Sequence, residues 1–254
     1  MKLDCVLTAV NEKQIYIDFI PFFIKAWKKL YPLVDIKIIL VADKIPDNFL
    51  KYKNNIILFK PLDNIFTAYI SQYIRLLYPC ILKYKNGVLI TDIDMIPMNK
   101  TYYSVNIEKH DNDKFIYFRE NICLDFNQIS MCYNVALPKI WSDIFSIKSI
   151  DDINNRLKDV FRKNTILEGI KNKGWGIDQV HLYSYVINWN NKTNNFVRLN
   201  EKETKFNRLN RHTFNINNFD EIGKKIKKGK FTDYHCYRPF NKYKKINNLI
   251  LSLL

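Results

Sequence analysis

Glycine and proline are scarce in this chain, which has 6 glycines and 8 prolines among 254 residues. No stretch rich in glycine and serine, or in proline, marks a linker between domains, and the sequence contains no internal repeat. Hydrophobic residues make up 47% of the chain, which is enough to fill a core and argues against disorder as the main state. We therefore expect one folded domain over residues 1–254.

Cysteine is also sparse, and no two cysteines form a C-x-x-C pair; they are Cys5, Cys80, Cys123, Cys132 and Cys236. Their odd number and wide spacing argue against a disulfide framework or a structural zinc site and favour a reducing compartment. Long hydrophobic runs are missing as well. Asp4 interrupts the short apolar run at the N-terminus, so no signal peptide is recognisable. The most apolar long segment, 15–30, contains charged residues and is shorter than the roughly 20 residues that cross a bilayer. These observations predict a soluble protein of the cytoplasm.

The charge is strongly one-sided, because 40 lysines and arginines against 25 aspartates and glutamates give a formal net charge of +15. A basic surface attracts phosphates, nucleic acids or anionic membranes. The chain is also rich in Lys, Asn, Ile, Tyr and Phe, the residues of A/T-rich codons, so genomic composition is an alternative explanation. The lysine run at 224–228 is typical of a solvated face, and peripheral contact with an anionic membrane is the alternative.

The hydrophobic pattern of the first hundred residues alternates strands with helices. Apolar and partly β-branched runs predict strands at 2–10, 35–43, 55–60 and 88–93. Helices are predicted at 64–82 and at 11–30, where Pro21 indicates a kink or a start near Asp18. This order predicts an α/β fold with a mostly parallel sheet flanked by helices.

The second half of the chain is less regular. Strands are predicted at 114–119 and 129–135, and helices at 138–145, 149–161, 178–186 and, as a basic amphipathic helix, 241–254. Ligands bind to mostly parallel sheets at the carboxyl ends of the strands. We therefore expect ligand contacts at one edge of the sheet, which carries Thr8, Ala9, Val10, Asp43, Asp92, Ile93 and Asp94.

Two acids, Asp92 and Asp94, follow the apolar run V-L-I-T and are two residues apart. In extended backbone this spacing puts both carboxylates on one face of the strand. Two like charges held together favour a cation between them, and oxygen ligands favour Mg²⁺ or Mn²⁺. The pair predicts a metal site that neutralises a diphosphate leaving group; two acids that cap a turn are the alternative.

Several segments resemble glycosyltransferases of the GT-A fold, which use nucleotide sugars. The segment G-V-L-I-T-D-I-D-M-I-P-M (87–98) resembles the D-x-D motif of that fold, and S-Q-Y-I-R-L-L-Y-P (71–79) resembles the helix before it. Further matching pieces are W-K-K-L-Y-P (27–32), M-C-Y-N-V-A (131–136), G-W-G-I-D-Q (174–179) and R-L-N-R (208–211). Over roughly residues 2–211 the chain is similar to small glycosyltransferases of large DNA viruses, including relatives of chlorella-virus glycan enzymes.

The resemblance implies one Rossmann-like GT-A domain that moves a sugar from a nucleotide-diphosphate donor, commonly a UDP-sugar, to a glycan or glycoprotein acceptor. It implies Mn²⁺ or Mg²⁺ as the cofactor. It also implies a nucleotide-sugar-binding half at 1–100 and an acceptor-binding half at 101–240. Asn11 resembles a position that lines the nucleotide pocket, and Arg211 is in place to reach the donor from a loop that closes the site.

Arg75 lies on the helix before the D-x-D segment, where its guanidinium can reach a phosphate or brace Asp92. Gln72 is one turn earlier on the same helical face. A surface arginine on an amphipathic helix is the alternative. His235 precedes Arg238-Pro239, and the resemblance implies that His235 is a third metal ligand and that Arg238 touches the diphosphate. The spacing between this histidine and the basic residue is shorter than in glycogenin-type enzymes, and a structural histidine is the alternative.

Asp178 follows the turn G-W-G, which can present an indole face to a sugar ring. A carboxylate beside that face can orient an acceptor hydroxyl or take its proton, so Asp178 is the candidate catalytic residue. A helix N-cap is the alternative. Partial patterns of both inverting and retaining enzymes are present, so the stereochemical outcome stays open.

Two other classes of function compete with sugar transfer. A metal-dependent nucleotidyltransferase also uses paired acids, but no Gly-Ser turn precedes Asp92, where the residues are K-Y-K-N-G-V. A basic nucleic-acid-binding protein fits the charge, but no zinc-finger, RRM or KH signature is present. We therefore expect no nucleic-acid partner.

Overall fold

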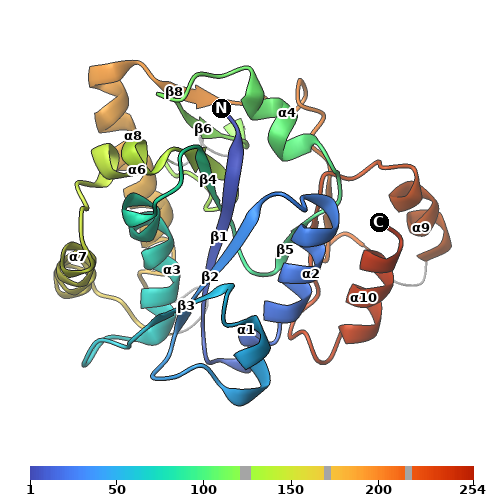
Figure 1. Ribbon diagram of the computed structural model, residues 1–254, viewed down its shortest axis with the longest axis horizontal. Coiled ribbons are helices and arrows are strands. Elements are labelled where there is room, and N and C mark those ends of the chain that lie inside the picture. Colours follow the sequence, from blue (N-terminus) through green and yellow to red (C-terminus); the bar gives the residue numbers. More distant parts are fainter. Residues whose placement is uncertain (121–126, 169–172, 215–218) are drawn as a thin grey trace.

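The computed structural model of the chain describes residues 1–120, 127–168, 173–214 and 219–254. A seven-stranded sheet runs through its centre in the order β3-β2-β1-β4-β7-β6-β8, and helices cover both of its faces (Figure 1). This arrangement confirms the predicted α/β fold with a mostly parallel sheet.

The parallel part of the sheet consists of β1 (Leu3–Asn11), β2 (Asp35–Val41), β3 (Ile56–Phe59) and β4 (Gly87–Ile90). These strands are rich in Val, Ile and Leu because both faces of the sheet are covered. At Gly87, a Cβ would meet the Lys2 carbonyl oxygen at 2.9 Å and the Val135 side chain at 2.8 Å, so the close approach of neighbouring strands requires glycine. β4 is thereby packed directly beside β1, and the two strands point the same way.

Two apolar clusters cover the opposite faces of the sheet, because alternate residues of β1 belong to different clusters. The first cluster includes α2 (Ile20–Leu30), α4 (Tyr102–Glu108) and α10 (Lys244–Ser252). The second includes α3 (Thr67–Leu77), α6 (Pro138–Phe145), α7 (Ile150–Lys163) and α8 (Ile177–Thr193). α3 packs against β1 and against α6, α7 and α8, so its single charged residue, Arg75, is buried with it.

Helix boundaries differ from the sequence predictions where proline or a turn intervenes. The segment predicted as one helix over 11–30 forms α1 (Gln14–Ile17) and α2, and Pro21 lies in the first turn of α2, where its missing N–H costs no hydrogen bond. α3 is shorter than the predicted 64–82 and continues as a 3₁₀ turn, η2 (Tyr78–Ile81), which contains Pro79. A second 3₁₀ turn, η1 (Asp47–Tyr52), joins β2 to β3.

The second half of the sheet contains the antiparallel strands. β7 (Asn134–Ala136) pairs antiparallel with β4 and β6 (Phe115–Tyr117), and β6 pairs parallel with β8 (Phe196–Arg198). The predicted strands at 114–119 and 129–135 are therefore reduced to three residues each. Residues 129–133 leave the sheet, and the Asn134 amide donates to the Ser130 carbonyl at 2.8 Å instead.

A second sheet, with strand order β5-β10-β9, was not expected from the sequence. It consists of β5 (Met95–Pro97), β10 (Asp233–His235) and β9 (Arg208–Asn210). A buried ion pair stabilises it, because Arg208 Nη2 lies 2.7 Å from Asp233 Oδ2 and the Tyr133 hydroxyl donates to the same carboxylate at 2.8 Å. This sheet brings residues far along the chain next to the D-x-D segment.

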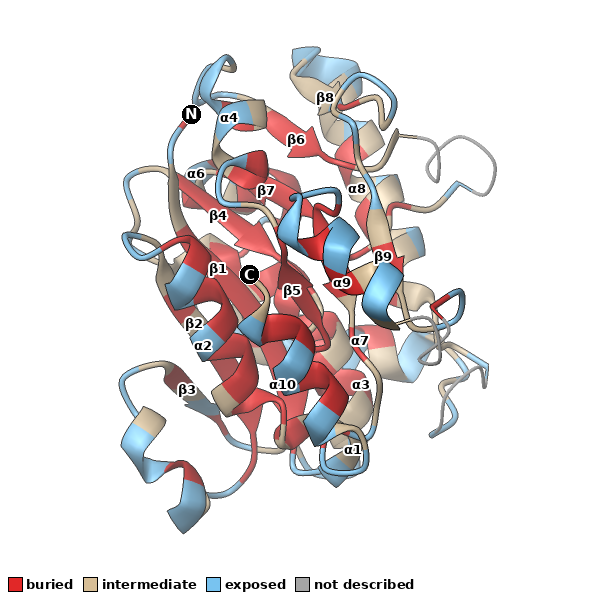
Figure 2. Cartoon of the chain, turned by 90° about the vertical axis from the view of Figure 1, so that its right-hand side faces the viewer, coloured by how far each residue is buried: buried red, intermediate tan, exposed pale blue. Residues whose placement is uncertain are grey.

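Two basic helices end the chain. The lysine run at 224–228 falls on and just after α9 (Phe219–Lys227), and its lysines are exposed. The predicted basic helix at 241–254 is present as α10, which buries Ile246, Ile250 and Leu251 and exposes its lysines (Figure 2). Within the described ranges, every helix is too short or too polar to cross a membrane.

Candidate active site

A cavity of about 240 Å³ opens at the carboxyl ends of β1 and β4, the edge at which the sheet topology predicted ligand contacts. The predicted site residues that line it are Ala9, Val10, Gln72, Arg75, Asp92, Ile93, Asp94, Arg211, His235 and Arg238. The fold thus brings these residues together from both predicted halves of the chain. Their individual roles stay predictions.

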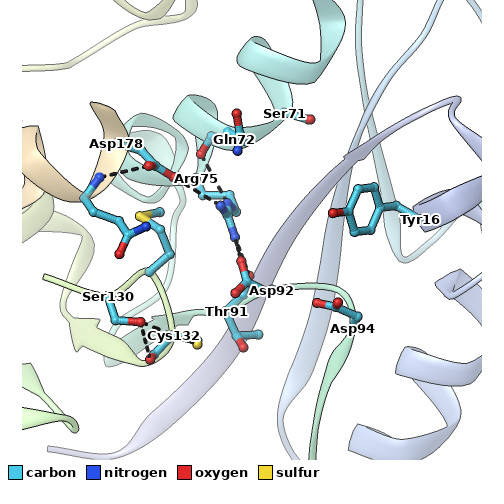
Figure 3. A network of polar contacts seen from close by, with 12 residues as sticks. Tyr16, Ser71, Gln72, Arg75, Thr91, Asp92, Asp94, Ser130, Cys132 and Asp178 are labelled. Atoms are coloured by element: carbon cyan, nitrogen blue, oxygen red, sulfur yellow. Dashed lines mark hydrogen bonds and ion pairs between the residues drawn. The ribbon is translucent and has the colours of Figure 1, made fainter. Parts of the chain in front are cut away.

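Asp92 and Asp94 lie in the turn that joins β4 to β5, where the Met95 N–H donates to the Asp92 carbonyl oxygen at 3.2 Å. β4 ends at Ile90, so the expectation that both carboxylates lie on one face of an extended strand is wrong. Both side chains still line the cavity, but they lie apart and have different partners (Figure 3). The Asp92 side chain is 37% exposed and the Asp94 side chain is 5% exposed.

Three cationic or potentially cationic side chains surround Asp94. Its Oδ2 lies 2.7 Å from Arg211 Nη1, 3.5 Å from Arg238 Nη1 and 3.6 Å from His235 Nε2. The second sheet sets this geometry, because Asn210 pairs with His235 in parallel register and Arg211 follows directly. The Cys236 N–H also donates to the Asp94 carbonyl oxygen at 2.8 Å. Asp94 is therefore attached to the C-terminal segment through both its backbone and its side chain.

These contacts determine the charge of Asp94. Burial by itself raises the pKa of its carboxyl group, but His235 and Arg211 outweigh burial and hold the pKa well below its usual range. Asp94 is thus an anion at neutral pH. Burial, followed by the charge of Asp94, raises the pKa of the neighbouring Tyr16 to about 12, so Tyr16 keeps its proton.

Asp92 belongs to a different set of contacts, centred on Arg75 (Figure 3). Arg75 Nη1 contacts the Asp92 carboxylate and donates to the Thr91 carbonyl at 3.3 Å, and Nη2 lies 3.4 Å from Asp178 Oδ2. Nε donates to the carbonyl of Gln72 at 3.2 Å. Of the alternatives for Arg75, the structure shows the contact with Asp92, and an Arg75 side chain that is 7% exposed is not a surface arginine.

Asp178 lies behind Arg75 rather than on the cavity wall, and its side chain is 4% exposed. It is not an N-cap, because Gly176 caps α8 and Asp178 accepts from the Gln179 N–H in the first turn. Burial raises the pKa of Asp178 to about 6, although Arg75 acts in the opposite direction. Asp178 therefore touches the site through Arg75, and its role as a proton acceptor stays an untested prediction.

Other predicted residues lie away from the cavity. Thr8 is fully buried inside β1, and Asn11 is buried at its end, where its amide donates to the Thr67 hydroxyl at 3.1 Å. Asp43 is exposed beyond the end of β2. None of these three described residues lines the cavity, because the strand-end rule selects an edge of the sheet and not individual side chains.

Sequence reasoning missed two residues that line the cavity. Tyr16 and Ser71 carried no signal, although Tyr16 follows β1 and Ser71 precedes Gln72 on α3. The Tyr16 hydroxyl contacts Arg238 Nη1, and the Arg238 guanidinium lies 5.2 Å from the Tyr16 ring centre. Trp175 belongs to the G-W-G turn, and the motif itself was the signal. The His212 ring lies 5.9 Å from the ring of His235.

The donor atoms suit a divalent cation in part. Asp94 Oδ2 and His235 Nε2 are 3.6 Å apart, a separation that two ligands of one ion can have. Asp92 is engaged by Arg75, and no cluster of three or more His, Cys, Asp or Glu that could hold a metal occurs in the described parts of the chain. Mg²⁺ is commonly held by one or two carboxylates together with substrate phosphates, so this set fits an ion that shares its coordination with a ligand.

Comparison with solved structures shows what the fold resembles. The galactosyltransferase LgtC, solved in complex with donor and acceptor sugar analogs, matches 98% of this chain and 96% of its own, with TM-score 0.51 and 11% identity. The glycosyltransferase GlyE of Streptococcus pneumoniae TIGR4 matches 99% of this chain with TM-score 0.53 and 14% identity. The bifunctional glycosyltransferase WbbM also matches 99%, with TM-score 0.52 and 9% identity.

The chain therefore has the GT-A fold. It spans 63% of GlyE and 50% of WbbM, so these two proteins contain parts without a counterpart here. No protein-family model and no curated protein matches the sequence.

Proposed function

We propose that this protein is a metal-dependent glycosyltransferase that moves a sugar from a nucleotide-diphosphate donor, with UDP as the expected nucleotide, to a hydroxyl group of a glycan. One observation supports this proposal most strongly. In a GT-A fold, a single cavity at the strand ends combines the Asp94–His235 pair with three guanidinium groups, those of Arg75, Arg211 and Arg238. Guanidinium groups recognise diphosphates, and an acid–imidazole pair suits a divalent ion.

The cationic side of the cavity supports a diphosphate leaving group. As the glycosidic bond breaks, negative charge grows on the diphosphate, and donors already in place stabilise it without reorganisation. Arg211 and Arg238 come from the ends of β9 and β10 and both reach the cavity. The Arg238 guanidinium lies over the Tyr16 ring, 5.2 Å from its centre.

Asp94 and His235 are the residues that would hold Mn²⁺ or Mg²⁺. When bound, the ion supplies charge neutralisation at the diphosphate. Asp94 is ready for this task because its low pKa keeps it ionised. Arg75 in turn fixes the orientation of Asp92, and Asp178 behind it supplies a second anion for the same guanidinium.

The acceptor side is expected near Trp175 and Gln72, which both line the cavity. An indole face provides a broad apolar surface for a sugar ring, and an amide can donate to and accept from hydroxyl groups. Gln72 shares α3 with Arg75, so acceptor and donor contacts are fixed by one buried helix.

A donor screen tests the proposal. The purified protein is incubated with Mn²⁺ and a panel of UDP-, GDP- and dTDP-sugars, with UDP-galactose included because LgtC is a galactosyltransferase. We expect slow release of one nucleoside diphosphate that EDTA abolishes. Release of pyrophosphate from nucleoside triphosphates, with no activity on any sugar nucleotide, would favour nucleotidyl transfer instead.

A further inference from the structure

The charges in the cavity and directly behind its wall balance without any ligand. Three guanidinium groups (Arg75, Arg211 and Arg238) pair with three carboxylates: Asp92 and Asp94 line the cavity, and Asp178 lies behind Arg75. A divalent ion alone adds two positive charges to this neutral, partly buried set. A nucleoside diphosphate alone adds negative charge. The two together leave the balance nearly unchanged, so the cavity favours their joint binding over either one alone.

Arg211 is the residue that sets this balance at the metal position. Its Nη1 lies 2.7 Å from Asp94 Oδ2, the same oxygen that lies 3.6 Å from His235 Nε2. Nη1 also donates to the Cys236 carbonyl at 2.6 Å. A divalent ion shared by Asp94 and His235 would therefore approach the oxygen that Arg211 already neutralises.

The three arginines differ in their contacts. Arg75 contacts two carboxylates and two backbone carbonyls from a buried helix. Arg238 contacts the Tyr16 hydroxyl and lies over its ring. Arg211 follows a strand of three residues, and both of its side-chain hydrogen bonds to described residues use Nη1. Nη2 and Nε make no hydrogen bond to the described residues, and the Arg211 side chain lines the cavity.

We propose that Arg211 is an exchange residue: it holds Asp94 in the ligand-free protein and transfers to the diphosphate when metal and nucleotide bind. This inference rests on the proposed function and adds a property to it. Arg211 lowers the affinity of the empty site for a divalent ion and raises the affinity for a diphosphate once the ion is present. Metal and nucleotide binding are thereby coupled, and by linkage each strengthens the other by the same factor.

Calorimetry on the full chain tests the exchange. Mn²⁺ is titrated alone, UDP is titrated alone, and each is titrated in the presence of the other, for the wild type and for Arg211→Gln. In the wild type we expect UDP to raise the affinity for Mn²⁺ by about 5- to 150-fold, the usual range of coupling between sites. In Arg211→Gln we expect Mn²⁺ alone to bind more tightly than in the wild type, UDP with Mn²⁺ to bind more weakly, and the coupling to shrink.

Arg162→Gln is the matched control, because it removes the same charge from the exposed last turn of α7. It should reproduce the wild-type affinities. Arg211→Lys keeps a charge but loses the planar fork, so it should give an intermediate affinity for Mn²⁺ and serves if the glutamine variant does not fold.

The outcomes separate this inference from the proposed function. If Mn²⁺ alone binds Arg211→Gln no more tightly than the wild type, the exchange is wrong even if nucleotide binding and transfer are intact. If the wild type binds no sugar nucleotide or nucleoside diphosphate, the proposed function is wrong, whereas the Mn²⁺ titrations still report whether Arg211 competes for Asp94.

Discussion

The two acids of the D-x-D segment are two residues apart in the chain but belong to two different regions of the molecule. Asp92 is attached to the parallel sheet and its helices through Arg75 on α3, which is in turn paired with Asp178 on α8. Asp94 is attached to the small sheet of β5, β9 and β10 through Arg211 and His235. The cavity lies at the junction of these regions, so each contributes one acid and at least one arginine.

The regions also differ in how they hold their side chains in place. In the parallel sheet, long apolar strands and a buried helix fix Arg75 through four polar contacts. In the small sheet the strands have three residues each, and the buried Arg208–Asp233 pair stabilises them. The Asp92 side of the cavity therefore depends on extended apolar packing, and the Asp94 side depends on short strands with a buried ion pair.

The largest effect is expected from Asp94→Asn. Transfer should fall by about 10²–10³-fold, because the variant loses a carboxylate that would hold the cation at the developing diphosphate charge. The ligand-free protein should also lose about 1–3 kcal/mol of stability, because Arg211 and Arg238 lose their anion. If Asp92 and Asp94 instead repelled each other on one strand face, Asp94→Asn would increase the stability of the ligand-free protein. The rate of turnover checks the first effect, and thermal melts without metal check the second. Asp43→Asn, at an exposed position, is the control. An unchanged rate at saturating Mn²⁺ would refute the assignment of Asp94 as a metal ligand.

Arg75→Ala tests the side of the cavity that contains Asp92. Donor binding should weaken by about 1.5–3 kcal/mol, the scale of a charge-assisted hydrogen bond. Arg75→Lys should restore only part of this, because an ammonium group cannot contact Asp92 and Asp178 with a planar fork. Calorimetry with UDP and Mn²⁺ measures both variants. Complete rescue by lysine would show that only the charge at this position matters.

Asp178→Asn tests whether Asp178 acts through Arg75. We expect transfer to fall about 10-fold together with donor affinity, the lower end of the range for a residue that positions a site group. A loss of about 10²-fold or more with unchanged donor affinity would instead indicate a general base.

The same variant has a predictable pH dependence. Burial raises the pKa of Asp178 to about 6 from its usual value of 3.8, so the folded protein binds this proton more tightly than the unfolded chain does. The Asp178 contribution to stability therefore falls as pH rises from about 4 to about 6 and stays unfavourable above that range. The difference in melting temperature between wild type and Asp178→Asn should change in the same window. A difference that is constant from pH 4 to 8 would contradict the raised pKa.

A smaller effect is expected from Trp175→Ala, which removes a cavity wall without changing any charge. The KM for the acceptor should rise about 3- to 10-fold, because stacking on an aromatic ring contributes about 0.5–1.5 kcal/mol. Trp175→Phe should keep most of the affinity. Steady-state kinetics with varied acceptor concentration checks this prediction. A change in UDP affinity alone would instead assign Trp175 to the donor-binding part of the cavity.

The smallest effect on transfer is expected from removing the exposed lysines of α9, as in Lys224→Ala combined with Lys225→Ala and Lys227→Ala. Transfer to a soluble acceptor should be unchanged, because these lysines do not line the cavity. Binding to vesicles that contain phosphatidylserine should weaken by about 1 kcal/mol per lysine if the helix rests on a membrane. Sedimentation with vesicles measures this binding. Unchanged sedimentation would support the other interpretation, in which the lysine run at 224–228 is a solvated face.

Sequence patterns alone were sufficient for the α/β class, the parallel strands of the first half and the edge that carries the cavity. Apolar runs of four or more residues and a helix with strong periodicity are local signals, and the strand-end rule follows from topology. Asp92, Asp94 and Arg75 could be selected for the same reason, since they lie at or beside these elements. The likeness to the D-x-D segment added the class of enzyme that we propose.

Only the tertiary structure decided which partner each acid has. Strands of three residues carry no readable period, so β5, β9 and β10 could not be predicted, and with them the pairing that brings Arg211 and His235 to Asp94. The placement of Asp178 behind Arg75 depends on the packing of α8 against α3, a contact between residues about a hundred positions apart. Local sequence patterns therefore identified the two acids, whereas long-range packing determined that Asp92 contacts an arginine on the buried helix α3 and Asp94 an arginine that follows β9.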